Sequence, residues 1–171
     1  MSTQEQNLVV QTYLSFCLTV ELKNNAFFAS EYFHNMNFDA PWVKQGLKEI
    51  GIDNRGNLLM ALYAMLVVPK ELVGKAYASE YSDINEWIAA QASNTVTTYA
   101  KDITRVDYIR HLRNAVAHAS IEVESPTFMR IRDQSLRVKK NEEFSTEFPL
   151  NKIGELLSKL QQVHIKYIES L

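Results

Sequence analysis

The chain has few of the residues that would place it in a specialised structural class. It contains one cysteine, Cys17, in 171 residues, so it forms no internal disulfide and offers no cysteine-based metal cluster. Cys17 lies in an apolar segment, which favours a buried thiol in a reducing compartment. The 5 glycines and 4 prolines form no linker, low-complexity stretch or phosphate-binding loop. We therefore expect a single domain over residues 1–171.

Long hydrophobic runs are also scarce. The uncharged stretch 6–20 includes several polar side chains. It is shorter than the roughly 20 residues that a membrane-spanning helix needs. No basic segment precedes it, which argues against a secretory signal. We expect a cytoplasmic protein without a membrane partner.

An excess of charge of one sign is missing overall, because the formal net charge is −2. The charges are nevertheless unevenly distributed. Residues 101–140 contain nine basic and five acidic residues, a net +4, which leaves −6 on the rest of the chain. A basic segment on an acidic body suits an anionic ligand bound at one face. Charge alone also fits an ordinary solvated surface.

The spacing of apolar residues predicts a mainly helical chain. The segment 5–23 is apolar over more than one face, so it should pack centrally or against a partner chain. Further helices are expected over 25–36, over 42–50, from a cap at Asp53 to about 68, and from a cap at Ser82 toward Tyr99. A final helix should follow Pro149.

A second group of elements is expected in the basic segment. Residues 104–107 (Thr-Arg-Val-Asp) have the form of a capping box and open a helix that should end near 119–120. The pattern then changes to period two over 121–123, 128–132 and 136–139, with a turn at 133–135. We expect a small antiparallel hairpin or sheet at about 121–139, before the C-terminal helix.

Residues suited to phosphate chemistry gather late in the helix that follows the capping box. Asn114 and His118 are four residues apart and share a face, which Arg110 joins from four residues before Asn114. Arg113 lies five residues before His118 and projects about 140° away on an ideal helix. Its long side chain would have to reach round to the same side.

These residue types suit one reaction, the attack of a ribose 2′-OH on its own 3′-phosphate. Histidine transfers protons near neutral pH, arginine presents a planar fork to phosphate oxygens, and asparagine orients either group. On spacing alone, Arg113 and Asn114 also fit surface positions, and His118 fits a helix end that bonds a carbonyl. Arg110 and His111 are candidate substrate-binding residues. His111 points to a different side of the helix, where it lines a cleft or, more simply, lies at the surface.

The run Arg113-Asn114-Ala115-Val116-Ala117-His118 resembles the R-N-x-x-x-H signature of the HEPN superfamily. The flanking helices are similar to the family's bundle of four to five helices. The resemblance implies a mainly α, HEPN-like helical bundle with Arg113, Asn114 and His118 as catalytic residues. The strands at 121–139 are outside the family's minimal core, and Ser120 replaces a tyrosine of one toxin branch.

The same resemblance implies a metal-independent endoribonuclease that uses no cofactor and binds RNA. It implies a homodimer in which both motifs meet in one composite cleft. It also implies a place among toxins and antiviral or plasmid-borne defence proteins, with an antitoxin or regulatory protein as a further partner. The alternative is a catalytically inactive HEPN domain that binds RNA, nucleotide or a protein partner. A third interpretation is a docking module that uses the aromatic N-terminal helices and the hairpin as its surface. The scattered histidines show no metal-ligand spacing, so no metal site is predicted.

Overall fold

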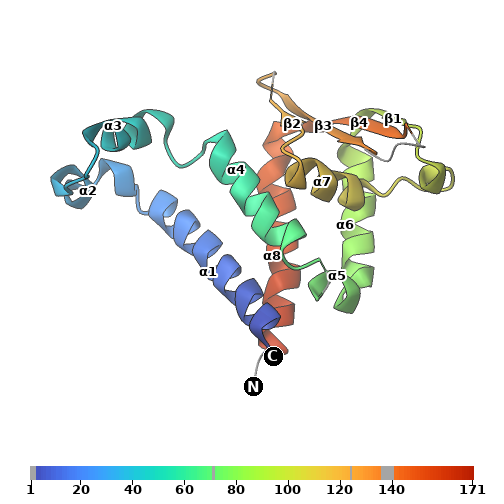
Figure 1. Cartoon of the computed structure of the whole chain (residues 1–171), viewed down its shortest axis with the longest axis horizontal. Coiled ribbons are helices and arrows are strands. Elements are labelled where there is room, and N and C mark those ends of the chain that lie inside the picture. Colours follow the sequence, from blue (N-terminus) through green and yellow to red (C-terminus); the bar gives the residue numbers. More distant parts are fainter. Residues whose placement is uncertain (1–2, 71, 124, 136–140) are drawn as a thin grey trace.

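The computed structural model describes residues 3–70, 72–123, 125–135 and 141–171 of the chain. It is mainly helical, and its strands form one four-stranded antiparallel sheet (Figure 1). The expected mainly α fold with a small antiparallel sheet is confirmed. Within the described ranges, no helix is both long enough and apolar enough to cross a membrane.

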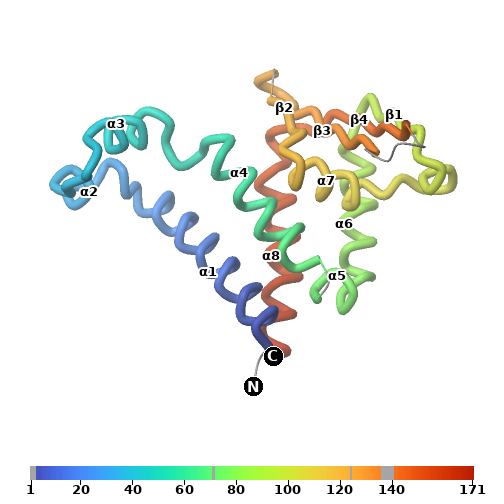
Figure 2. The backbone as a smooth tube through the Cα atoms, in the orientation of Figure 1, coloured from blue at the N-terminus to red at the C-terminus, as the bar shows by residue number. Residues whose placement is uncertain are grey.

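The N-terminal helices form an arm that projects from the rest of the molecule (Figures 1 and 2). Its elements are α1 (Gln4–Asn24), the 3-10 helix η1 (Phe27–Ala29), α2 (Glu31–Asn35), α3 (Pro41–Ile50) and α4 (Arg55–Leu62). Aromatic rings pack at its tip around the buried Phe33, whose ring centroid lies 4.9 Å from that of Phe28 and 5.7 Å from that of Phe38. The segment 25–36 therefore forms two short helical pieces instead of the single helix expected.

Local signals fix the ends of the arm's helices. Gly51 follows α3 with a φ of 66°, a conformation that a glycine adopts without strain. Asn54 caps α4 by accepting a hydrogen bond from the Asn57 backbone N–H at 3.0 Å. The cap is therefore one residue later than the expected Asp53, whose carboxylate instead lies 2.8 Å from the Lys23 ammonium.

The body of the molecule contains the sheet and the remaining helices. The helical elements are the π-helical segment η2 (Tyr63–Val67), α5 (Val73–Ala76), α6 (Ala78–Gln91), η3 (Ala100–Asp102), α7 (Tyr108–Ala117), η4 (Leu150–Lys152) and α8 (Ile153–Glu169). The strands are β1 (Ser93–Thr97), β2 (Ile121–Glu122), β3 (Phe128–Gln134) and β4 (Glu143–Pro149), in the order β1-β4-β3-β2.

Helix α7 is the central element of the body. It contacts β3 on one side, and it contacts η2 and α6 on the other (Figure 1). Its apolar residues Leu112 and Ala115 are almost wholly buried, together with Met65 of η2 and Met129 of β3. The core therefore joins the sheet to the helices through α7.

The helix expected between Ser82 and Tyr99 is wrong at both ends. α6 begins at Ala78, so Ser82 lies inside it, and it ends at Gln91. The β-branched residues that follow form β1, where Thr95 Oγ1 lies 2.8 Å from Thr146 Oγ1 of β4. Pairing with β4 thus outweighs the helical spacing upstream.

The later elements agree better with the pattern. α7 begins at Tyr108 instead of after a Thr104 cap, because Asp107 accepts a hydrogen bond from the Arg110 backbone N–H at 2.9 Å. β2 and β3 confirm the strands predicted at 121–123 and 128–132. The turn expected at 133–135 is wrong, since β3 continues to Gln134, and β4 was not predicted. The strand expected at 136–139 lies outside the described residues.

The position of Leu112, 1% exposed in the middle of α7, gives a test of the packing. We expect Leu112→Ala to lower the free energy of unfolding by about 2–5 kcal/mol, because a cavity remains between α7 and its neighbours. Urea denaturation followed by circular dichroism measures the change. The control is Ile103→Ala, at a site that is 84% exposed. Equal stability of the two variants would contradict the central place of α7.

Candidate functional site

Helix α7 carries all five candidate residues, and its first turn is fixed to α6. The buried Asn85 of α6 donates from Nδ2 to the Val106 carbonyl at 3.0 Å. Its Oδ1 accepts from the Ile109 backbone N–H at 3.1 Å. One side chain thus satisfies a carbonyl before the helix and an orphan N–H inside it. The start of α7 is therefore held in a defined place.

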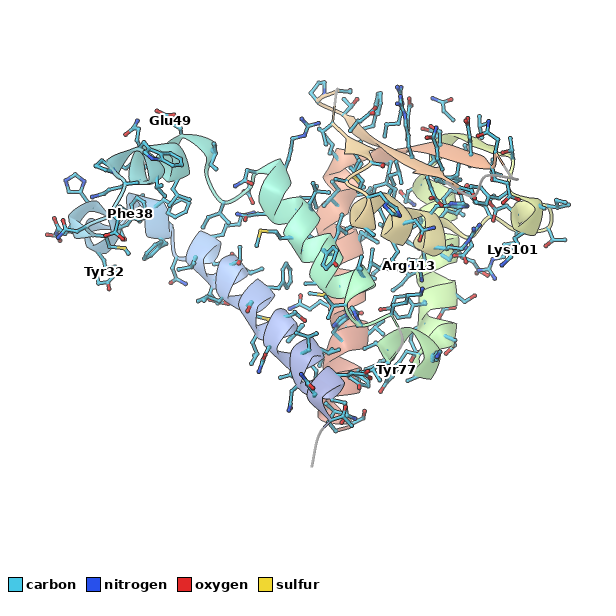
Figure 3. The ribbon with its side chains drawn as sticks, viewed as in Figure 1. Tyr32, Phe38, Glu49, Tyr77, Lys101 and Arg113 are labelled. Carbon is cyan, nitrogen blue, oxygen red and sulfur yellow. The ribbon has the colours of Figure 1, made fainter. Side chains whose placement is uncertain are left out.

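The structure places Arg113 in a pocket beside α7 and His118 at the exposed end of the helix. Arg113 is half-buried and lines a pocket of about 520 Å³ between α5, α6 and α7. Figure 3 shows it on the side of α7 away from the sheet. His118 is the exposed C-cap of the helix, where its backbone N–H donates to the Asn114 carbonyl at 3.0 Å. Among the described residues, no contact joins the Arg113 and His118 side chains.

Asn114 faces the sheet. Its Nδ2 donates to Oδ2 of Asp133 on β3 at 3.0 Å. A carboxylate only accepts hydrogen bonds, so the amide nitrogen must be the atom that points to Asp133. The amide orientation of Asn114 is therefore fixed by the sheet.

Arg110 is held by two carboxylates. Its guanidinium lies 2.7 Å from Asp102 Oδ1 and 3.6 Å from Asp107 Oδ2. The guanidinium carbon also lies 4.9 Å from the ring centroid of Tyr99, which suits a cation–π contact. These contacts leave Arg110 at the wall of the same pocket as Arg113, with a fixed direction.

His111 is fully buried, so the surface position expected from the sequence is wrong. Its Nδ1 lies 2.7 Å from Asp133 Oδ2, and its Nε2 lies 2.7 Å from Asp102 Oδ2. The ring stacks on Phe144 of β4, with centroids 3.8 Å apart and planes at 1°. The edge of Tyr99 closes the other side at 4.8 Å. A burial of this kind favours a role in positioning neighbours over direct contact with a substrate.

Polar groups surround both ring nitrogens of His111. Each nitrogen lies 2.7 Å from a carboxylate oxygen, and Nη2 of Arg110 also lies 2.9 Å from Nε2. Burial works against ionisation of Asp102, but the hydrogen bonds from His111 and Thr97 and the charges of His111 and Arg110 lower its pKa on balance.

The Tyr99 phenol lies beside this cluster. Burial and the Asp133 carboxylate raise the pKa of Tyr99 to about 12. Arg110 and His111 together contact both carboxylates, and each carboxylate meets a different ring nitrogen of His111. Within the described ranges, no three histidine, cysteine or acidic side chains are arranged to hold a metal ion.

Sequence reasoning missed both carboxylates of this cluster. Asp133 was assigned to a turn, but it continues the inward alternation of Met129 and Ile131 along β3. Extending the period-two pattern by one repeat would have placed it next to α7. Asp102 gives no comparable local signal. It lies in the 3-10 turn η3 and is buried in contact with Thr97, Arg110 and His111.

The cluster predicts an unusual sensitivity at position 111. We expect His111→Ala to lower the free energy of unfolding by about 3–5 kcal/mol, because two buried carboxylates lose the side chain that joins them. Urea denaturation of the variant measures the loss. His118→Ala is the matched control, since it removes an exposed imidazole from the end of the same helix and should change stability by less than about 0.5 kcal/mol. Similar losses in both variants would contradict the supporting role of His111.

Comparison with known proteins adds one finding to this geometry. Neither the curated proteins nor the solved structures give a match to the chain. A protein-family model does: the model described as HEPN pEK499 p136 matches residues 1–171, which is the whole sequence. The superfamily expected from the motif on α7 is confirmed, and the chain belongs to the HEPN pEK499 p136 family.

Proposed function

We propose that the chain is a metal-independent endoribonuclease of HEPN type, with Arg113, Asn114 and His118 at the reaction centre. The observation that supports this most is the lack of an anionic partner at Arg113. The neighbouring arginines are paired, since Arg105 lies 3.2 Å from Glu86 and Arg110 lies 2.7 Å from Asp102. Arg113 is half-buried, yet in the described part of the chain its side chain has neither an ion pair nor a hydrogen bond. An arginine held without a counter-charge is suited to a phosphate ligand.

The proposed reaction uses one base, one acid and one cation. A His118 imidazole accepts the proton of the ribose 2′-OH, whose oxygen attacks the adjacent phosphorus. Arg113 stabilises the charge that develops on the phosphorane oxygens. The bond from phosphorus to the 5′-oxygen breaks, and an imidazolium protonates that oxygen. The products are a 2′,3′-cyclic phosphate and a 5′-hydroxyl.

The reaction places two demands that one copy of the chain does not meet. A single His118 cannot be base and acid in the same step. His118 of the same copy also does not line the pocket that Arg113 lines, because it is the exposed C-cap of α7. We therefore propose a homodimer in which the motif of each copy completes the other in a shared cleft.

The arm is the proposed dimer surface. Twelve large hydrophobic side chains are exposed among the described residues, and eight of them lie between residues 8 and 63: Leu8, Leu14, Leu18, Tyr32, Trp42, Ile50, Met60 and Tyr63. Several border a groove of about 1060 Å³ between α1, α4 and the start of α8. Exposed apolar surface gathered on one projecting element favours burial against another chain.

A second candidate is a catalytically inactive HEPN domain that binds RNA, nucleotide or a protein partner. The separation of Arg113 from His118 favours it, since binding through Arg113 does not need the histidine. Both candidates are compatible with a role in toxin or antiviral defence and with an antitoxin or regulatory protein as partner. RNA cleavage distinguishes them.

The nuclease is tested by cutting of a labelled single-stranded RNA in EDTA. We expect the wild type to cut, and we expect His118→Ala and Arg113→Ala to lower the rate by about 10²–10⁴-fold, because each removes proton transfer or charge stabilisation. Ile103→Ala is the control, since it removes a side chain that is 84% exposed and lies outside the arm. An inactive wild type, or full activity of His118→Ala, would leave only binding as the function.

The dimer is tested on α1. Leu14 and Leu18 are 58% and 60% exposed, so replacing both with arginine leaves the core of one copy intact. We expect the wild type to have twice the chain mass of 19.7 kDa in light scattering, and the double variant to have the mass of one chain. Ile103→Arg, at an exposed site in the body, should remain dimeric. A monomeric wild type, or a dimeric double variant, would refute this surface.

A further inference from the structure

Asn114 is the proposed site residue whose side chain is attached to the sheet. Its Nδ2 donates to Asp133 Oδ2 at 3.0 Å, across the contact between α7 and β3 (Figure 1). Among the described residues, the side chains of Arg113 and His118 have no hydrogen bond. The proposed reaction uses a cation and two proton transfers, none of which requires a carboxylate on the sheet. The contact between Asn114 and Asp133 therefore needs a separate account.

Asp133 is held in one place by its surroundings. It is buried on β3, an inner strand of the sheet, and it lies opposite Phe144 in the continuous register of β3 and β4. The oxygen that accepts from Asn114 also lies 2.7 Å from Nδ1 of His111. A carboxylate contacted from two sides on an inner strand moves only if the sheet moves. Asp133 therefore gives the amide nitrogen of Asn114 one fixed acceptor.

The fixed nitrogen limits what the rest of the Asn114 amide can do. The oxygen and the nitrogen of a planar amide point in different directions from the same carbon, so Oδ1 is directed away from the carboxylate. In the described part of the chain, Oδ1 receives no hydrogen bond. A carbonyl oxygen only accepts hydrogen bonds, and so do the oxygens of an ionised phosphate. The open oxygen of Asn114 is therefore suited to an N–H or O–H donor and not to a phosphate.

His118 is a donor within reach of this oxygen. It lies four residues after Asn114, and side chains at this spacing are neighbours on a helix. In the proposed reaction one ring nitrogen of His118 transfers the proton, so the other ring nitrogen carries an N–H of its own. A hydrogen bond from that N–H to a carbonyl oxygen fixes which nitrogen faces the substrate. His118 is the exposed C-cap of α7, so its ring turns toward Asn114 without displacing buried side chains.

We propose that Asp133 is a positioning residue that acts through Asn114 on His118. The carboxylate holds the amide nitrogen, the amide oxygen accepts from one ring nitrogen of His118, and the other ring nitrogen transfers the proton. The part in cleavage rests on the proposed function, whereas the orientation of the ring does not. The strand β3 is outside the helical core that the resemblance implies, yet it takes part in the chemistry through this chain of contacts.

Two substitutions at position 133 separate the acceptor from the charge. Asp133→Leu removes the acceptor at similar size, and Asp133→Asn keeps an oxygen that accepts from Asn114. We expect Asp133→Leu to lower kcat for RNA cleavage about 10–10²-fold with KM unchanged, because the reacting group is misplaced while substrate binding is kept. Asp133→Asn should retain most of the wild-type kcat. Thr146→Val is the matched control and should cut as the wild type does, since it removes a buried hydrogen bond of the same sheet on β4.

A double variant tests whether Asp133 acts through Asn114. Asn114→Ala should lower kcat as much as Asp133→Leu does, and the double variant should lose no more than either single variant. Losses that multiply in the double variant would show two separate roles and overturn the proposal. An unchanged kcat in Asp133→Leu, an equal loss in Thr146→Val, or a loss that appears only as a raised KM would overturn it as well.

The orientation of His118 is measured without cleavage and without a variant of Asp133. Long-range ¹H–¹⁵N NMR of the full chain, at a pH where His118 is neutral, records which ring nitrogen carries the proton. We expect the ratio of the two tautomers to differ between the wild type and Asn114→Ala. An equal ratio overturns the proposal, even if Asp133→Leu does not fold. If the wild type cuts no RNA but the ratio changes as expected, the nuclease fails and the orientation of His118 by Asn114 stands.

Discussion

The buried ring of His111, contacted by a carboxylate at each nitrogen, is the feature on which the arrangement of the site depends. It joins three segments that are distant in the sequence, because Asp102 precedes α7, Asp133 belongs to β3 and Phe144 belongs to β4. A buried polar cluster stabilises a fold only when every member has its partner, and removal of one member leaves the others unsatisfied. Here His111 and Arg110 contact the two carboxylates, and Thr97 of β1 donates to Asp102 at 2.8 Å. The sheet is therefore part of the site's support, although it is outside the helical core that the family resemblance implies.

Local patterns predicted much of the fold, and non-local pairing decided the rest. The segments 5–23 and 42–50 are helical as their apolar spacing predicts, and Gly51 ends the second of them. The strand β1 was not predicted, because its β-branched residues follow a helix directly and become a strand only beside β4. In β4, Phe144 and Phe148 alternate inward with Thr146, a period-two signal that was present in the sequence and overlooked.

In the candidate site too, the sequence predicted some features, and contacts between distant segments decided the others. The family resemblance proposes Arg113, Asn114 and His118 as site residues. Arg113 lines the pocket between α5, α6 and α7, whereas His118 is the exposed C-cap of α7. The burial of His111 was not predictable from its own neighbourhood. Its partners Asp102 and Asp133 lie on either side of it in the sequence and reach it only through the folded sheet. A polar residue on a helix is expected at the surface unless partners of this kind bury it.

The position of His111 relative to the motif has a mechanical consequence. Residues 111 and 113 project about 200° apart on a helix, so a contact that fixes one also fixes the direction of the other. His111 is held at both ring nitrogens and on its stacked face, which prevents α7 from rotating about its axis. Asn114 shares the carboxylate of Asp133 with it, and Arg113 is directed to the opposite side, into the pocket. The contacts of His111 thus set the side of α7 from which Arg113 projects, while the Arg113 side chain itself has no ion pair or hydrogen bond among the described residues.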